Sequence, residues 1–97
     1  MKDKLSIFNR IRLHLFISGR VQGVFFRITM YQKAKKVTGF VKNLQDGRVE
    51  AVIEGEKAEV DKLVKWARKG TFLSKIDNID IIEEEYTGKF NKFDILY

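Results

Sequence analysis

The stretch from residue 11 to residue 36 joins two different spacings of apolar residues, and this most limits what the chain can fold into. Aliphatic residues alternate with other residues from Ile11 to Ile17, which is the period-two pattern of a half-buried strand. From about Phe25 to Lys36 the apolar spacing becomes helical. The stretch therefore predicts a strand that passes through a glycine-bounded turn directly into a helix.

The turn itself has the chemistry of an anion site. Gly19 and Gly23 permit a positive φ and the close approach of a ligand to the main chain. Backbone N–H groups in such a turn, followed by the start of a helix, form a concavity suited to an anion. Arg27 falls in the first helical turn, within reach of the same concavity. We therefore predict a phosphate or oxyanion cradle; the alternative is an ordinary glycine-bounded turn with a solvated arginine.

The rest of the chain predicts a hairpin, a second helix and two further strands. We expect a strand over residues 40–44, an Asp-Gly turn at 45–48 and a return strand over 49–54. A helix follows over about 57–69, and Gly39 and Gly70 are interpreted as the stops of the two helices. A fourth strand runs through residues 76–81 into a solvated acidic run at 83–85, and residues 93–97 form a short terminal strand.

This order predicts an α+β, ferredoxin-like split β-α-β fold (βαββαβ), an antiparallel sheet with two helices on one face plus the short C-terminal strand. The first and third strands are central. The cradle is therefore expected to lie close to Asn43, which belongs to the predicted strand over residues 40–44. The 97 residues suffice for one domain. We expect a mobile N-terminal extension over residues 1–9 and the domain over 10–97.

Composition excludes several kinds of site and partner. The chain has no cysteine, which excludes disulfides and thiolate nucleophiles. The single histidine, His14, is predicted at the surface, opposite the aliphatic stripe of its strand, and cannot form a multi-histidine metal site. No apolar run approaches the ~20 residues that span a membrane, and no signal peptide is evident. We therefore expect a cytoplasmic protein whose net charge of +6 attracts anions without selecting one.

Two glycine-bearing segments resemble the acylphosphatase family, small enzymes that hydrolyse carboxyl-phosphate anhydrides. The first family motif reads Gly-x-Val-Gln-Gly-Val-x-Phe-Arg, and residues 19–27 match every defined position. The second reads Gly-aromatic-x-basic-Asn, then Gly-x-Val and a later Gly; residues 39–43, 47–49 and Gly55 match it. The resemblance covers roughly residues 11–97 and implies the same ferredoxin-like fold.

The resemblance also implies roles for individual residues. Arg27 would bind the phosphoryl group together with backbone amides of the loop, and Asn43 would orient the attacking water. The loop amides would come from the following residues: Arg20, Val21, Gln22, Gly23 and Val24. Gly19, Gly39 and Gly47 would be structural. The implied protein is a metal-independent monomer without a cofactor that converts acyl phosphate to carboxylate and inorganic phosphate.

The sequence departs from the family pattern at two places. The stretch between Arg27 and Gly39 is shorter than usual, which bears on where Asn43 lies. Gly70-Thr71 stands where a Gly-Pro pair is usual, and we expect this change to be distant from the chemistry.

The available side chains also limit the reaction. With no cysteine to become phosphorylated and no base near the cradle, direct in-line attack by water remains. A carboxylate leaves unaided because its conjugate acid has a pKa of about 4. An alkoxide would need a general acid, and none is evident. Acyl phosphates are therefore expected rather than ordinary phosphomonoesters.

Two alternatives remain. RNA-recognition modules share the predicted fold, but they stack bases on aromatics of the two central strands. Residues 49–54 contain two glutamates and no aromatic, so we do not expect a nucleic-acid partner. The second alternative is a catalytically silent anion-binding module, or a relative of the acylphosphatase-like domain at the front of larger carbamoyl-transfer maturation proteins.

Overall fold

The computed structural model describes residues 9–97, so the predicted N-terminal extension lies, apart from Asn9, outside the described residues. The elements follow in this order: β1 (Arg10–Arg20), α2 (Phe26–Lys33), β2 (Thr38–Asn43), β3 (Val49–Glu56), α3 (Lys57–Lys69), β4 (Lys75–Glu84) and β5 (Phe93–Leu96). The predicted α+β order is confirmed.

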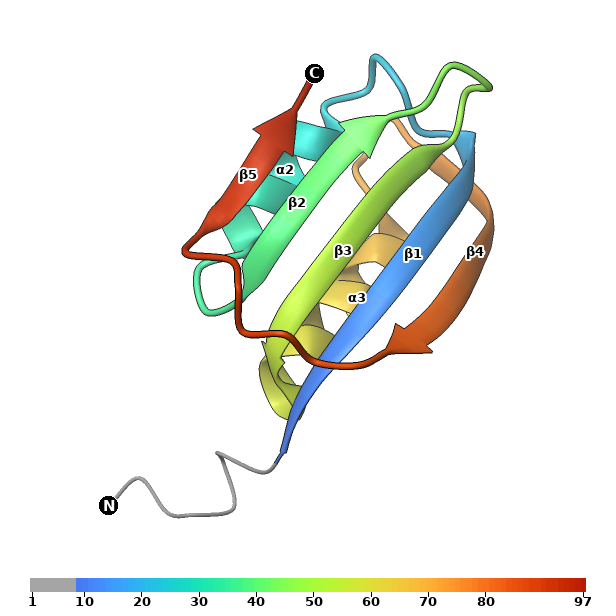
Figure 1. Ribbon diagram of the computed structural model, residues 1–97. Coiled ribbons are helices and arrows are strands. Elements are labelled where there is room, and N and C mark those ends of the chain that lie inside the picture. Colours follow the sequence, from blue (N-terminus) through green and yellow to red (C-terminus); the bar gives the residue numbers. More distant parts are fainter. Residues whose placement is uncertain (1–8) are drawn as a thin grey trace.

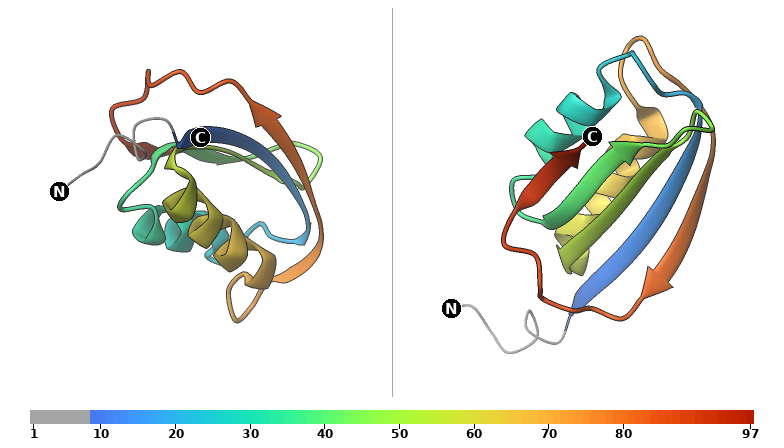
Figure 2. Two further views of the ribbon diagram at one scale, coloured as in Figure 1. Left: turned by 90° about the horizontal axis from the view of Figure 1, so that it is seen from below. Right: turned by 45° about the horizontal axis from the view of Figure 1, so that its top comes forward.

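The strands form one sheet in the order β4-β1-β3-β2-β5 (Figure 1). β1 pairs antiparallel with both β3 and β4, and β2 pairs antiparallel with β3. Both helices cover one face and leave the other face open (Figure 2). β5 differs from its neighbours because it runs parallel to β2. The chain after β4 crosses the open face first, so it enters β5 from the end where β2 begins (Figure 1).

A strap over residues 85–92 makes this crossing, and a buried carboxylate holds it in place. Glu54 on β3 is fully buried. It accepts hydrogen bonds from Thr87 N (3.0 Å), Thr87 Oγ1 (2.8 Å), Gly88 N (3.0 Å) and Arg12 Nη1 (3.1 Å). Burial alone would raise the pKa of Glu54, but these hydrogen bonds hold it below its usual value. Because the strap is fixed, so is the position of β5.

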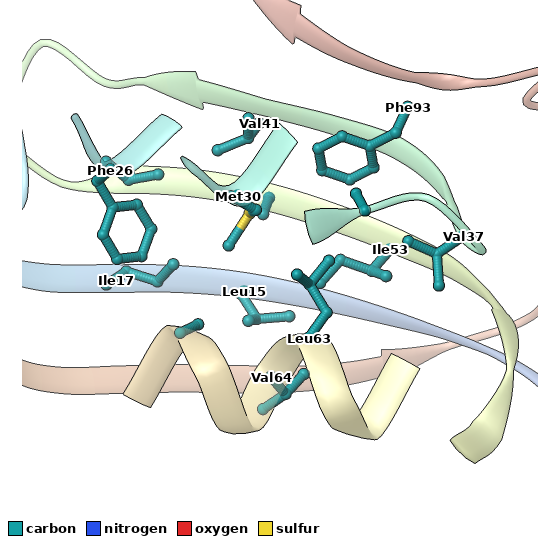
Figure 3. Packing of buried hydrophobic residues seen from close by; sticks show 14 of the residues in the cluster. Leu15, Ile17, Phe26, Met30, Val37, Val41, Ile53, Leu63, Val64 and Phe93 are labelled. Carbon is teal, nitrogen blue, oxygen red and sulfur yellow. The ribbon is translucent and has the colours of Figure 1, made fainter. Parts of the chain in front are cut away.

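The core lies between the sheet and the helices (Figure 3). α3 buries the stripe predicted for it: Val60, Leu63, Val64 and Ala67. α2 is shorter than predicted and ends at Lys33. Of its two apolar stripes, the one with Phe26 and Met30 is buried, whereas Ile28 and Tyr31 are exposed. A helix of eight residues lying on a sheet has only one face against it, so the second stripe faces away from the sheet.

Gly39 was interpreted as a helix stop, and the structure corrects this. It lies inside β2, opposite Ile53, with a φ of 134°. A Cβ at this position would collide with the carbonyl oxygen of Val52. Gly39 therefore permits the close approach of β2 and β3, and four residues, 34–37, are enough to join α2 to β2.

Candidate active site

The turn between β1 and α2 leaves its amide groups unused. Val21 and Val24 are buried and anchor it in the core, while Gly23 is exposed with a φ of 73°. Among residues 9–97, the backbone N–H groups from Gln22 to Phe25 find no hydrogen-bond acceptor. They lie at the start of α2, where the helix dipole favours negative charge. The turn therefore has the donors that an anion needs.

Arg27 stands in the first turn of α2 beside these amides. Its side chain is half-buried, and its Cζ lies 5.1 Å from the centre of the Tyr97 ring. It forms no ion pair with a carboxylate in the described part of the chain. A guanidinium of this kind keeps its forked donors available for two oxygens of a phosphoryl group.

Asn43 is the last residue of β2 and lies opposite Val49. Its Oδ1 is buried and has no hydrogen-bond partner among the residues that the structure describes. A buried amide oxygen normally has a partner, because leaving it unpaired costs about 1–3 kcal/mol. This oxygen can accept a hydrogen bond from a water molecule.

Gln22 links the turn to the strand end that carries Asn43. Its Nε2 donates to Leu44 O at 2.8 Å and to Arg48 O at 2.9 Å. These two carbonyls flank the β2–β3 turn, and Leu44 directly follows Asn43. The structure thus brings together the two predicted halves of the site. For Gln22 only a role of the backbone amide was predicted, and this contact of its side chain was not.

Thr71 contacts the turn, although we expected the change at Gly70-Thr71 to be distant from the chemistry. The Thr71 hydroxyl donates to the carbonyl oxygen of Val24 at 2.8 Å. In a planar trans peptide the C=O and the following N–H point in opposite directions. The bond therefore turns the Phe25 N–H away from Thr71 and helps to fix the orientation of the loop amides.

A pocket of about 260 Å³ opens beside the turn. It is lined by Val21, Gly23, Phe25, Phe26, Arg27, Ile28, Ile95 and Tyr97. It thus contains Val21, Gly23 and Phe25 of the turn and Arg27 of α2 but does not include Asn43. None of the described residues that line it is acidic. Arg20, exposed at the end of β1, does not line it either.

His14 lies on the open face of the sheet, whereas the helix bearing Arg27 lies on the other face. It is more enclosed than predicted: its Nε2 is 2.6 Å from Glu50 Oε2, and its Nδ1 is 2.8 Å from Glu84 Oε2. Partial burial opposes the charged ring, but the two carboxylates outweigh it and raise the pKa of His14. Phe16 on the same face is stacked on His14 at 4.7 Å and covered by Arg48 at 5.0 Å. Paired charges thus occupy the place where an RNA-binding sheet presents free aromatics.

Two further kinds of feature are absent from residues 9–97. No group of three or more histidine, aspartate or glutamate side chains is arranged to hold a metal ion. No helix in this part of the chain has the length and apolar character needed to cross a membrane.

Comparison with known proteins connects this geometry to a family. The family model for acylphosphatase matches residues 13–95. An acylphosphatase of Syntrophus aciditrophicus is 47% identical over 88 residues, covering 89% of this chain and 92% of that protein.

Solved structures agree in fold and show where else the fold occurs. An acylphosphatase from Bacillus subtilis superposes with a TM-score of 0.86 at 34% identity, covering 90% of this chain and 99% of the other. HypF from T. kodakarensis gives a TM-score of 0.78 at 30% identity, but this chain covers only 12% of it. The fold therefore also occurs as a small part of a longer protein. The match over residues 13–95 and the identity to a relative of nearly the same length show that this chain belongs to the acylphosphatase family.

Proposed function

We propose that this hydrolase cleaves the carboxyl-phosphate bond of acyl phosphates by in-line attack of water. Arg27 and the backbone amides of residues 20–24 hold the phosphoryl group, and Asn43 orients the water. The observation that carries the proposal is the buried, unpartnered Oδ1 of Asn43, one residue before Leu44, to which Gln22 ties the loop. The family membership supports the same reaction.

The proposed step needs no acid or base from the protein. The water donates a hydrogen bond to Asn43 Oδ1, which aims its oxygen lone pair at phosphorus. As the new P–O bond forms, the bond to the carboxylate oxygen breaks, and the proton of the water passes to solvent or to the phosphate product. In a loose transition state of this kind, catalysis is mostly positioning and charge stabilisation. The carboxylate leaves unprotonated because its conjugate acid has a pKa of about 4.

The positive charge in this scheme comes from the guanidinium of Arg27 and the amide dipoles, so we propose that no metal or other cofactor is required. Every group in the scheme comes from one chain. We therefore propose a monomer, and sedimentation at the assay concentration tests its oligomeric state. The location that we propose for it is the cytoplasm.

The first experiment measures hydrolysis of acetyl phosphate with and without a chelator. We expect turnover that the chelator does not change and that inorganic phosphate inhibits. If folded protein binds phosphate but turns over no acyl phosphate, the protein is an anion-binding module and the enzymatic proposal is wrong.

Two substitutions separate the proposed roles. Arg27→Ala should weaken both turnover and inhibition by phosphate, because it removes the fork that binds the phosphoryl oxygens. Asn43→Ala should lower kcat by about 10²–10³-fold, the usual effect of losing one positioning or stabilising group, with phosphate inhibition largely kept. Arg68→Ala and Asn91→Ala, at exposed positions outside the pocket, are the matched controls. A fully active Asn43→Ala enzyme would contradict the role given to this side chain.

A further inference from the structure

The pocket beside the proposed phosphate site is walled by large apolar side chains that the core does not use. Phe25 is 66% exposed, Ile28 is 42% exposed and Tyr97 is 99% exposed. They come from the turn, from the outward stripe of α2 and from the residue after β5, and they line one pocket. In Figure 2 the end of β5 lies beside the start of α2, in agreement with the contact between Arg27 and Tyr97.

Phe25 is held in this position by an unfavourable backbone conformation. Its φ of 64° and ψ of 20° are left-handed, and it is the only described residue other than glycine with a positive φ. Such a conformation costs about 1–3 kcal/mol and persists only where the surroundings enforce it, often at a ligand site. The first family motif leaves this position undefined, so the motif itself does not require a phenyl ring here.

The geometry of in-line attack says which part of the substrate the pocket can take. The leaving carboxylate departs from the side of the phosphorus opposite the attacking water. The pocket contains Gly23 and Arg27, which the proposal places against the phosphoryl group, but not Asn43, which it places against the water. The acyl group therefore has space in this pocket, on the side without Asn43.

We propose that this pocket binds the acyl group of the substrate and makes the enzyme prefer acyl phosphates with an apolar acyl chain. The inference rests on the proposed function. At about 260 Å³ the pocket is smaller than the roughly 300–1,000 Å³ of sites for drug-sized ligands. It therefore suits a short aliphatic chain or a single ring. Arg27 is the only charged side chain among the described residues that line it, and the proposed function assigns this guanidinium to the phosphoryl group. A charged acyl end would therefore lose water without gaining a cation of its own.

A chain-length series tests the preference with little change in leaving-group acidity. Acetyl, butyryl and hexanoyl phosphates release carboxylates of similar basicity. A fully buried methylene changes kcat/KM by about fourfold. Since the pocket is open on one side, we expect about twofold per methylene, or about 16-fold over the four methylenes between acetyl and hexanoyl phosphate. Succinyl phosphate matches butyryl phosphate in length but ends in a carboxylate, and it should be the poorer substrate.

Substitutions in the pocket wall assign the effect to it. Phe25→Ala and Ile28→Ala should each reduce the ratio of hexanoyl to acetyl kcat/KM by about threefold, since each removes part of the apolar wall. Phe72→Ala is the matched control, because Phe72 is 100% exposed and lies outside the pocket. It should leave the ratio at its wild-type value.

The outcomes separate this inference from the proposed function. A flat chain-length series, a preference for succinyl phosphate, or wild-type ratios in both Phe25→Ala and Ile28→Ala would overturn the acyl pocket while acetyl phosphate turnover stood. Absence of turnover with every member of the series would overturn both.

Discussion

Replacing Gln22 by leucine tests whether the link between the loop and the β2–β3 turn sets the catalytic geometry. Leucine removes both donors while keeping a side chain of similar size. Neither carbonyl becomes unpaired, because Leu44 O still accepts from Gly47 N at 3.2 Å and Arg48 O still accepts from Leu44 N at 2.8 Å. The loss is therefore two net hydrogen bonds, or about 1–3 kcal/mol in the free energy of unfolding. For a domain of this size, each kcal/mol lowers Tm by about 4–8 °C.

The effect on turnover should exceed the effect on stability. A displacement of about 1 Å between reacting groups can cost about 10²-fold in rate, and the variant frees the loop to shift relative to Asn43. Arg27 and the amides move with the loop, so the inhibition constant of inorganic phosphate should change by less than about threefold while kcat falls by about 10²-fold. Steady-state assays with acetyl phosphate, below the Tm found by circular dichroism, measure both.

Gln45→Leu is the control, because Gln45 is an exposed glutamine in the same turn whose side chain bonds to no described residue. It should keep the wild-type kcat and Tm. A Gln22→Leu enzyme with unchanged kcat would refute the reasoning that this link positions Asn43. A parallel loss of phosphate binding and kcat would mean that Gln22 shapes the loop itself.

Three other substitutions probe the loop support, the open face and the sheet, and a fourth, Gly47→Ala, is the control for the sheet. Thr71→Val removes the hydrogen bond to the loop and should weaken phosphate inhibition of acetyl phosphate hydrolysis by about fivefold, the worth of one net hydrogen bond. The raised pKa of His14 stabilises the fold fully below its unfolded pKa of about 6.5, and this stability is lost as pH rises through the higher folded pKa. The free energy of unfolding of the wild type, measured in urea, should therefore fall as pH rises above about 6.5, and His14→Gln should abolish this pH dependence. Gly39→Ala should lower the free energy of unfolding by more than about 2 kcal/mol, because its Cβ meets a β3 carbonyl. Gly47→Ala, whose Cβ meets no atom within 4 Å, should cost about 1 kcal/mol in thermal unfolding.

Each of these has a contradicting result. Unchanged phosphate inhibition in Thr71→Val would remove Thr71 from the support of the loop. A fall in stability above pH 6.5 that persists in His14→Gln would have another source. If Gly39→Ala and Gly47→Ala lowered the free energy of unfolding equally, β2 and β3 would be able to move apart at Gly39 without loss of stability.

Local spacing was enough to predict the elements and their order. α3 runs from Lys57 to Lys69, the bounds expected from a single apolar stripe and the glycine that follows it. α2 was predicted too long because its apolar spacing continues at Ala34 and Val37, which are buried beyond the end of the helix. Its apolar residues form two stripes. Only one of them meets the core, while Ile28 on the other lines the pocket. A periodic apolar pattern predicts which side chains are removed from water, but not whether the core or a bound ligand covers them.

The sequence by itself determined the α+β fold, the glycine-bounded turn and, through the family resemblance, the choice of Arg27 and Asn43 as candidates. Only the tertiary structure decided how these parts are joined. Gln22 reaches carbonyls 22 and 26 residues away, and Thr71 reaches a carbonyl 47 residues away. The strap, fixed by Glu54, carries Tyr97 across the sheet to Arg27. Apolar periodicity is a local property of the chain, whereas a hydrogen bond near 3 Å between distant loops depends on how every intervening element packs.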